Sequence, residues 1–371
     1  MRRGGPAGRR LNLGDSLLAG EQVEEAVLHE GLSMSEPKPF SFYEIQPNGK
    51  ILFFVDASLL KSFSHCEAYF YLKHVKNIRQ KGTVITKPFP MAIGSWWSDV
   101  MEAFYNSLRD KRELGLQDIQ DIALQAWASN GLEACALAEP DKFAQFGDIA
   151  GAVLMLKDYY ESQYLIDKHN WKVVSVEEGF GLKKEVFIGE TPRVVVYWVG
   201  RPDLVVVENE RLTPVDHKTV SRIDGFTTSR YKPSTQMSGY TYSCEVIAKS
   251  LGYGVRVDRC IVNICSRARP TDKPRSGQKR PRFIRAYPNF TREEIEEWRR
   301  NVVGICERIA QNLRSNEWTW METSCHNFYM RPCDYLKLHS ATPSSRDIIL
   351  AADFAEGRPW KPYEPSKEVE D

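Results

Sequence analysis

The sequence predicts an α/β protein whose core of helices and strands carries helical additions. Residues 193–207 and 211–219 are rich in valine or alternate in polarity, as strands do. Residues 116–166 have a helical pattern throughout. Along the chain the order is a helix, three strands, a helix and a strand, which is typical of a mixed α/β core.

The bulk composition sets limits on the class of protein. The chain has 371 residues, of which 42% are hydrophobic and 27% charged, as in ordinary globular proteins. Fifty basic and 49 acidic side chains leave a formal net charge of +1, so any basic surface must be local. Eight cysteines are too few for a disulfide scaffold of this length, and no apolar run approaches the ~20 residues of a membrane span. We therefore expect a cytoplasmic protein with mostly free thiols.

The folded part is predicted to be one domain over residues 41–345. Residues 1–40 lack sustained periodicity and are rich in glycine, arginine and glutamate, so they are expected to be a disordered tail. Residues 346–371 are charged and proline-rich at their end, and they are expected to be a second tail. Within the domain, residues from about 112 to 168 are predicted to be a helical insertion.

Four helices are predicted around the strands. The first begins near Asp56 or Ser58, and the last begins at Thr291 with a capping box that includes Glu294. The second has apolar residues at helical spacing. The predicted ranges are 56–76, 94–109, 235–249 and from 291 onwards.

Strands are predicted at 172–177, 193–207, 211–219 and 259–265. The polar break at 208–210 suits a tight turn, so the second and third of these strands form a hairpin.

The predicted hairpin brings charged residues together. Folded about Asn209, it places Asp203 opposite Val215 or Asp216, and like charges opposite each other are destabilising. Because side chains alternate between the faces of a strand, Asp216 shares a face with Lys218 and His217 points the other way. Two carboxylates and one ammonium group are therefore expected on one face of the sheet.

A divalent cation would resolve this conflict of charges. Mg²⁺ prefers oxygen ligands, usually one or two carboxylates together with water and substrate phosphate. Such an ion can polarise a phosphate and lower the pKa of a bound water, and Lys218 can orient that water or stabilise charge in the transition state. The alternative is a surface hairpin in which aspartate and lysine side chains merely pair.

Four short motifs resemble those of the PD-(D/E)xK nuclease superfamily. GRPD at 200–203, followed by DHK at 216–218, resembles the superfamily signature. QMSGY at 236–240 and GSWWSDVME at 94–102 are similar to the Q-x3-Y and G-x3-H-x3-E motifs of its RecB-like branch, which includes phage exonucleases. The resemblance spans residues 55–340 approximately. It implies a restriction-endonuclease-like core made of a helix, a three-stranded antiparallel meander, a helix and a strand.

The resemblance also implies roles for individual residues. The implied metal ligands are Asp203, Asp216 and the main-chain carbonyl of His217, and the implied catalytic groups are Lys218, Gln236, Tyr240 and Glu102. Ser98 departs from the family pattern, because it stands where the family has a histidine and serine is a poor metal ligand. Glu177 and Glu178, on the preceding strand, are candidates for further acids of the site, but they are expected to be ordinary charges at the end of a strand.

The function implied by the resemblance is a Mg²⁺- or Mn²⁺-dependent deoxyribonuclease. Family analogy favours an exonuclease that acts in DNA recombination and repair or in phage DNA processing, inside a bacterial or phage-infected cell. The implied partners are DNA and a helicase, a recombinase or a single-strand annealing protein. Two alternatives remain open: a non-catalytic DNA-binding or assembly subunit, which Ser98 favours, and a nuclease that acts on RNA.

One early cysteine and a late group resemble the iron–sulfur staple of the same branch. They are Cys66, Cys325, Cys333 and His339. The spacing between the two late cysteines is long, and His339 stands where a final cysteine is expected. Three readings are open: a [4Fe–4S] cluster, a structural zinc ion, and buried free cysteines. The remaining cysteines lie in apolar stretches and are predicted to be core residues: Cys135, Cys244, Cys260, Cys265 and Cys306.

A basic segment at 267–285 is a candidate for contact with nucleic acid. It has eight basic residues, one acid, several prolines and a glycine, so it is predicted to be a loop that follows phosphates without reading sequence. The alternative is a solvated loop. Trp96 and Trp97 are expected in the core rather than stacked on bases. The basic residues are Arg267, Arg269, Lys273, Arg275, Lys279, Arg280, Arg282 and Arg285.

Overall fold

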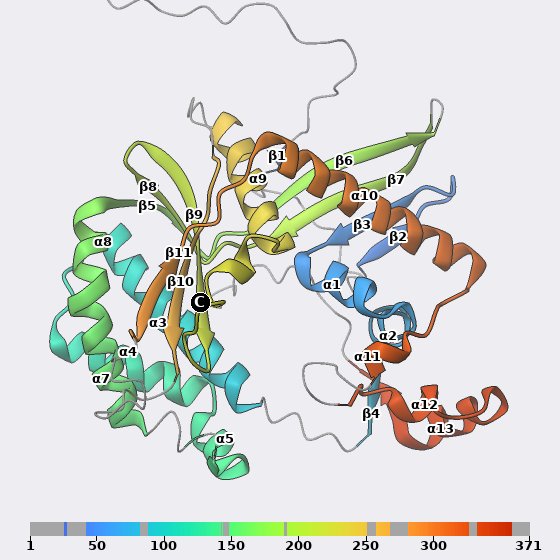
Figure 1. The fold of residues 1–371 in the computed structure, drawn as a ribbon, viewed down its shortest axis with the longest axis horizontal. Helices are drawn as coiled ribbons and strands as arrows, with labels where there is room; N and C mark the ends of the chain where they lie inside the picture. The colour runs from blue at the N-terminus through green and yellow to red at the C-terminus, as the bar shows by residue number, and fades with distance from the viewer. Residues whose placement is uncertain are drawn as a thin grey trace, which may run out of the picture.

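The computed structural model describes residues 26–27, 42–81, 88–141, 143, 148–188, 191–250, 257–267, 281–325 and 332–357. They form two five-stranded sheets, a two-stranded ribbon and the helices that cover them (Figure 1). Across these ranges, no helix is both long and apolar enough to cross a membrane.

The first sheet, here called the core sheet, has the strand order β11-β10-β9-β8-β5. Strands β5, β8 and β9 are antiparallel, β10 runs parallel to β9, and β11 is antiparallel to β10. This arrangement confirms the predicted three-stranded meander followed by a helix and a strand. The strands are β5 (Trp171–Val176), β8 (Leu204–Glu208), β9 (Arg211–Val220), β10 (Ile261–Ser266) and β11 (Phe283–Ala286).

Helices α3 (Phe89–Arg109) and α9 (Thr235–Ser250) lie on opposite faces of the core sheet. Val215 of β9 is buried in the cluster that contains the α3 side chains. Leu212, on the other face of β9, packs with Cys244 and Ala248 of α9. The alternation of side chains along one strand therefore gives each helix its own apolar surface.

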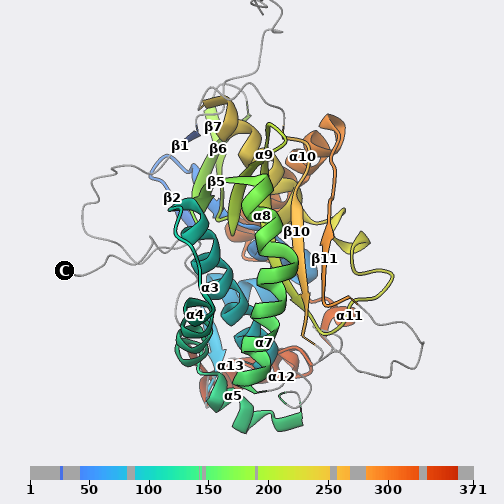
Figure 2. The ribbon, with the colours of Figure 1, turned by 90° about the vertical axis from the view of Figure 1, so that its left-hand side faces the viewer.

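The helical insertion extends the α3 layer. Its apolar side chains pack in one cluster with those of α3, including Trp96 and Trp97, which confirms that both tryptophans belong to the core. In Figure 2 these helices face the viewer. The insertion consists of α4 (Leu116–Ser129), α5 (Leu132–Ala138), α7 (Ile149–Tyr159), a π-helical turn (Tyr160–Tyr164) and α8 (Leu165–Asn170).

The second sheet, here called the outer sheet, was not predicted. Its strand order is β1-β6-β7-β3-β2, and β3 runs parallel to β7. The strand β1 lies within the predicted N-terminal tail, yet it pairs with β6. The strands are β1 (Ala26–Val27), β2 (Tyr43–Ile45), β3 (Ile51–Val55), β6 (Phe180–Ile188) and β7 (Thr191–Gly200).

The predicted single strand at 193–207 is wrong, because the chain changes sheets within it. Strand β7 ends at Gly200 in the outer sheet, and β8 begins at Leu204 in the core sheet. Pro202 lies between them and has no N–H to donate to a ladder. A Cβ on Gly200 would lie 2.8 Å from the Phe180 ring, so a larger residue at this crossing would force that ring to shift.

Helices α1 (Ala57–His65) and α10 (Arg292–Ser315) pack in the cluster beside the outer sheet. Asp56 caps α1 by accepting from the Leu59 N–H at 2.7 Å. The capping box of Thr291 and Glu294 at the start of α10 is present as predicted. The predicted first helix is interrupted at Cys66, beyond which α2 (Glu67–Phe70) and a π-helical turn (Tyr71–Val75) complete it.

The predicted C-terminal boundary at residue 345 is wrong. Helix α13 (Arg346–Asp353) and strand β12 (Phe354–Glu356) follow it, and β12 pairs antiparallel with β4 (Ile78–Gln80). Phe354 is buried beside Cys325, so its apolar contacts hold this segment on the folded domain. The short helices α11 (Glu322–Cys325) and α12 (Leu336–His339) belong to the same region.

Candidate active site

The hairpin of β8 and β9 fixes the register of the charged residues. Asn209 and Glu210 both have positive φ values, 49° and 61°, as the central residues of a type I′ turn require. Leu204 pairs with Val215, so Asp203 immediately precedes the paired strand and faces the position of Asp216. The backbone N–H of His217 donates to Asp203 Oδ2 at 2.6 Å, which confirms that Asp203 lies against β9.

Asp216 is the most enclosed group of the site, with 1% of its surface exposed. Its Oδ1 accepts from Lys218 Nζ at 2.8 Å and from Gln236 Nε2 at 3.2 Å. Its Oδ2 is buried and has no hydrogen-bond partner. The predicted shared face of Asp216 and Lys218 is therefore confirmed, and one carboxylate oxygen retains an unused acceptor.

The charges of the site are strongly coupled. Burial, followed by the charge of Asp216, raises the pKa of Asp203 to about 8. Burial also raises the pKa of Asp216, against the attraction of Lys218. Burial would lower the pKa of Lys218, but the two aspartates outweigh it and the net shift is upward. When both carboxylates are ionised, they carry one negative charge more than the single ammonium group can balance. A bound cation would supply the missing positive charge.

Helix α9 supports the site from one side. Gln236 Nε2 also donates to the hydroxyl of Tyr240 at 3.0 Å, one helical turn further on. The Tyr240 hydroxyl donates to the carbonyl oxygen of Arg201 at 2.9 Å. The motif residues of α9 thus connect Asp216 with the segment that precedes Asp203.

Glu177 belongs to this site, contrary to the expectation of an ordinary strand-end charge. Its carboxylate lies 2.8 Å from Arg201 Nε and accepts from Ser98 Oγ at 3.3 Å, while its own N–H donates to the carbonyl of Asp203 at 3.1 Å. Its φ of 53° turns the chain at the end of β5. Burial raises the pKa of Glu177 to about 7, against the attraction of Arg201. The signal in the sequence was an acid directly after a strand, but Glu178 beside it is exposed.

Ser98 and Glu102 lie next to Glu177 rather than between the aspartates. Ser98 uses its hydroxyl on Glu177, at the helix position where the family has a histidine. Glu102 is exposed on α3, and its charge adds to the rise in the pKa of Glu177. The α3 motif therefore contacts the site through the hydrogen bond from Ser98 to Glu177.

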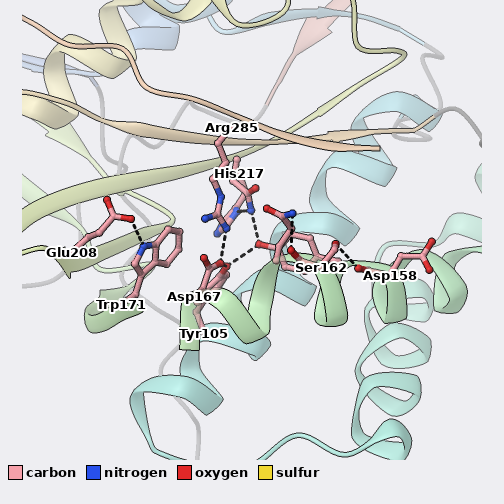
Figure 3. Close-up of polar contacts among 11 residues, drawn as sticks. Tyr105, Asp158, Ser162, Asp167, Trp171, Glu208, His217 and Arg285 are labelled. Atoms are coloured by element: carbon pink, nitrogen blue, oxygen red, sulfur yellow. Dashed lines mark hydrogen bonds and ion pairs between the residues drawn. The ribbon is translucent and has the colours of Figure 1, made fainter. Parts of the chain in front are cut away.

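A buried polar network supports β9 from the face opposite the carboxylates (Figure 3). As predicted, His217 points to the face of the sheet opposite Asp216 and Lys218. Its Nδ1 accepts from Asn263 Nδ2 at 3.1 Å. Its ring stacks on Tyr105 at a centroid distance of 5.4 Å. The hydroxyl of Tyr105 donates to Asp167 Oδ2 at 2.6 Å, and Arg285 donates to the same oxygen at 2.6 Å. The network thus joins the helical insertion to the strand that carries the site.

The prediction that Arg285 contacts nucleic acid is wrong, because its guanidinium is used inside this network. The side chains of Arg282 and Arg285 are only 13% and 12% exposed. Arg267 is partly buried, and its Nε is enclosed without a partner. The other predicted contacts lie outside the described residues: Arg269, Lys273, Arg275, Lys279 and Arg280.

The four residues of the predicted staple gather in a separate region. Cys66, Cys325 and Cys333 are buried in one cluster, and Cys325 Sγ lies 2.8 Å from His339 Nδ1. Cys66 Sγ accepts from the Tyr69 N–H at 3.4 Å. Cys333 Sγ accepts from the Tyr335 N–H at 3.4 Å. Burial raises the pKa of the Cys333 thiol to about 11.

The remaining cysteines are buried as predicted, and burial raises the pKa of Cys244 to about 12. Within the described ranges, no three or more histidine, cysteine, aspartate or glutamate side chains have the arrangement of a metal site. Both metal centres therefore stand as proposals.

Comparison with known proteins assigns the family. A family model described as the PD-(D/E)XK nuclease superfamily matches residues 57–336, so the chain belongs to this superfamily. No curated protein matches the sequence.

Two solved structures are similar at low identity. One is described as a "putative exonuclease" from Eubacterium rectale, with 13% identity, a TM-score of 0.40, and coverage of 78% of this chain and 88% of that chain. The other, SSO0001, has 13% identity, a TM-score of 0.26, and coverage of 65% of this chain and 94% of that chain. Because both TM-scores are below 0.5, the assignment rests on the family model.

Proposed function

We propose that this chain is a metal-dependent deoxyribonuclease that hydrolyses phosphodiester bonds beside Asp203, Asp216 and Lys218. One observation carries the proposal: Asp216 is buried with an unpartnered oxygen, next to the half-buried carboxylate of Asp203 and a lysine. Such an arrangement has no structural benefit by itself, because burying like charges together is costly. Membership of the nuclease superfamily supports the same conclusion.

The residues of the site fit a divalent cation. Asp203, Asp216 and the main-chain carbonyl of His217 would hold it, and the free acceptor of Asp216 supports this set. When bound, such an ion polarises a phosphate oxygen and lowers the pKa of the attacking water. Mg²⁺ and Mn²⁺ both accept carboxylate oxygens.

The chain's own residues supply positioning and charge. Lys218 is held by Asp216, and its ammonium group would orient the attacking water and stabilise the charge that develops on the phosphate. Gln236 and Tyr240 fix the orientation of Asp216 and of the Arg201 backbone. Glu177, whose pKa is raised to about 7, is placed to accept a proton near neutral pH.

The broader role follows from the motifs of the RecB-like branch. We propose an exonuclease that acts on DNA ends in recombination, repair or phage DNA processing, together with a helicase, a recombinase or a single-strand annealing protein. The presence of both motifs supports this proposal, and their residues Gln236 and Ser98 contact Asp216 and Glu177.

A cleavage assay tests the proposal. End-labelled linear single- and double-stranded DNA is incubated with Mg²⁺ or Mn²⁺ and wild type, Asp216→Ala or Lys218→Ala. Lys337→Ala is the matched control, because Lys337 also pairs with an aspartate but lies on the exposed surface of α12. We expect cleavage by wild type and by the control alone. If wild type binds DNA but is inert with both metals, the chain is a non-catalytic DNA-binding or assembly subunit.

We propose that Cys66, Cys325, Cys333 and His339, which gather the donor types of a structural centre, hold an iron–sulfur cluster or a zinc ion. Two of the sulfur atoms accept backbone N–H groups, as the sulfur ligands of clusters do. A bound metal would offset the burial that raises the pKa of the Cys333 thiol. A bound ion would tie α2 to the C-terminal region and so close a very long loop.

A further inference from the structure

The segment that joins β9 to α9 (Figure 1) carries an exposed phenylalanine, Phe226. Phe226 is 79% exposed, and the other largely exposed aromatic side chain of the described residues, Tyr287, is 47% exposed. A single exposed apolar residue is common on protein surfaces. Phe226 differs from such residues in three respects: hydrogen bonds order its turn, the turn follows the strand that carries the proposed active site, and exposed basic residues flank it.

Phe226 is held outward by an ordered turn. Its own N–H donates to Asp224 Oδ1 at 3.0 Å, and the hydroxyl of Thr227 donates to the same oxygen at 2.8 Å. The N–H of Asp224 in turn donates to Thr227 Oγ1 at 2.8 Å. Ile223 and Tyr231 anchor the two sides of the turn in the hydrophobic cluster beneath it. The ring is therefore presented on a preorganised base.

The turn follows the C-terminal end of β9, the middle strand of the sheet that carries the proposed active site. It follows Lys218 on β9 and precedes Gln236 on α9, both of which contact Asp216. Tyr231 lies near the site, because the charges of Lys218 and Asp216 act on its pKa, which burial raises. A strand with its phosphate at Asp216 would therefore pass close to this turn.

The charges around Phe226 suit a polyanion. Arg222, Arg230 and Lys232 are exposed in the same segment. Arg230 lies 3.8 Å from Asp224 and Lys232 lies 2.8 Å from Glu294 of α10, so the three cations leave one positive charge in excess of these two acids. In a nucleic acid strand every base is flanked by phosphates. Proteins that bind unpaired strands combine cations that follow the backbone with aromatic rings that stack on bases.

We propose that Phe226 stacks on an unpaired nucleobase of the DNA strand whose phosphodiester is held at Asp203 and Asp216. The proposal rests on the proposed nuclease function and adds a substrate contact to it. Because every base has a π-face, this contact would favour unpaired ends without selecting a sequence.

Binding of short DNA tests this contact apart from cleavage. Single-stranded oligonucleotides carry 2-aminopurine, a fluorescent base whose emission is quenched by stacking, at successive positions from the end. They are titrated with the full chain in Ca²⁺, which takes carboxylate and phosphate oxygens as ligands and replaces Mg²⁺ so that cleavage does not obscure binding. A blunt duplex serves for comparison. The proteins are wild type, Phe226→Ala, Phe226→Leu, Phe226→Trp and Ile348→Ala. Ile348 is the control because it is 71% exposed on α13, in the cysteine region.

We expect wild type to quench the probe at one position near the bound phosphate. Phe226→Ala and Phe226→Leu should lose this quenching and bind the single strand about five- to hundredfold more weakly, with a smaller loss for the duplex. Phe226→Trp and Ile348→Ala should behave as wild type.

Equal binding and quenching by wild type and Phe226→Ala would overturn the stacking contact, as would full retention by Phe226→Leu. If these results accompany normal cleavage, only the contact fails. If wild type neither binds nor cuts DNA, the proposed function fails with it.

Discussion

The carboxylate site of the core sheet, formed by Asp203 and Asp216, and the cluster of Cys66, Cys325 and Cys333 both gather potential metal ligands. They differ in the free-energy cost of folding without a bound metal. Asp216 is buried and Asp203 half-buried, and the pKa values of both are raised, so the folded chain disfavours their charged forms. Cys66, Cys325 and Cys333 are buried thiols, which are comfortable in an apolar cluster when neutral. Burial therefore favours a bound cation at the carboxylate site. At the cysteine cluster, burial is compatible with a bound metal and equally with neutral thiols.

The largest expected difference between the regions is in catalysis. We expect Lys218→Ala to lower kcat by about a thousandfold, or ~4 kcal/mol, because it removes a charge aimed at the transition state. Cys66→Ser should leave kcat unchanged at a temperature where the variant is folded. Single-turnover cleavage measures both values. Equal losses in the two variants would mean that the cysteine region takes part in the active site.

The next effect concerns the face of β9 opposite the carboxylates. We expect Asp167→Ala to reduce the free energy of unfolding by about 3 kcal/mol, because it leaves Arg285 buried without its partner. Asp167→Leu combined with Arg285→Met should recover most of this loss. Urea unfolding measures the difference. A loss below ~1 kcal/mol for Asp167→Ala would show that the network does not support the strand that carries the site.

A smaller effect is expected when the cysteine region is altered. Serine at position 66 can still cap α2, as the cysteine sulfur does by accepting from the Tyr69 N–H, so Cys66→Ser tests the metal rather than the helix. We expect the purified variant to lose iron or zinc and to have a lower Tm than Cys135→Ser, which alters another buried cysteine. Anaerobic purification with metal analysis makes the measurement. Wild type without either metal would show that these cysteines are core residues only.

The last effect is the dependence of stability on pH. A carboxyl whose pKa is about 8 in the folded protein, as in Asp203, keeps its proton while the unfolded chain loses it near pH 4. Without metal, stability should therefore fall as pH rises from about 5 to 8, and Mg²⁺ should reverse the trend. Asp203→Asn should reduce this dependence, and Glu177 and Asp216, whose pKa values are also raised, account for what remains. Thermal melts across this pH range check the sign, and a rise in Tm with pH in metal-free protein would contradict it.

The hairpin could be predicted from sequence because its determinants are local. A polar turn at Asn209 sets the register, and period-two alternation then places Asp216 and Lys218 on one face. The outer sheet could not be predicted in this way. Its β3 and β7 are parallel and come from distant parts of the chain, and the change of sheet after Gly200 occurs within one continuous strand-like run.

Long-range burial also explains the misjudged charges. Glu177 and Glu178 are alike in sequence, but a left-handed turn at the end of β5 buries only the first, against Ser98 and Arg201. Arg285 belongs to a basic segment, yet β11 carries it to Asp167 in the helical insertion. No local pattern distinguishes these residues from their solvated neighbours.

The most direct test that the carboxylate site binds a cation is a calorimetric titration of metal-free protein with Mg²⁺ at pH 7, in two buffers of different ionisation enthalpy. Wild type should bind the ion and release protons, because Asp203 must lose its proton to become a ligand. Asp216→Asn should bind much more weakly. Failure of wild type to bind Mg²⁺, or equal binding by Asp216→Asn, would contradict the assignment of these carboxylates as the cation site.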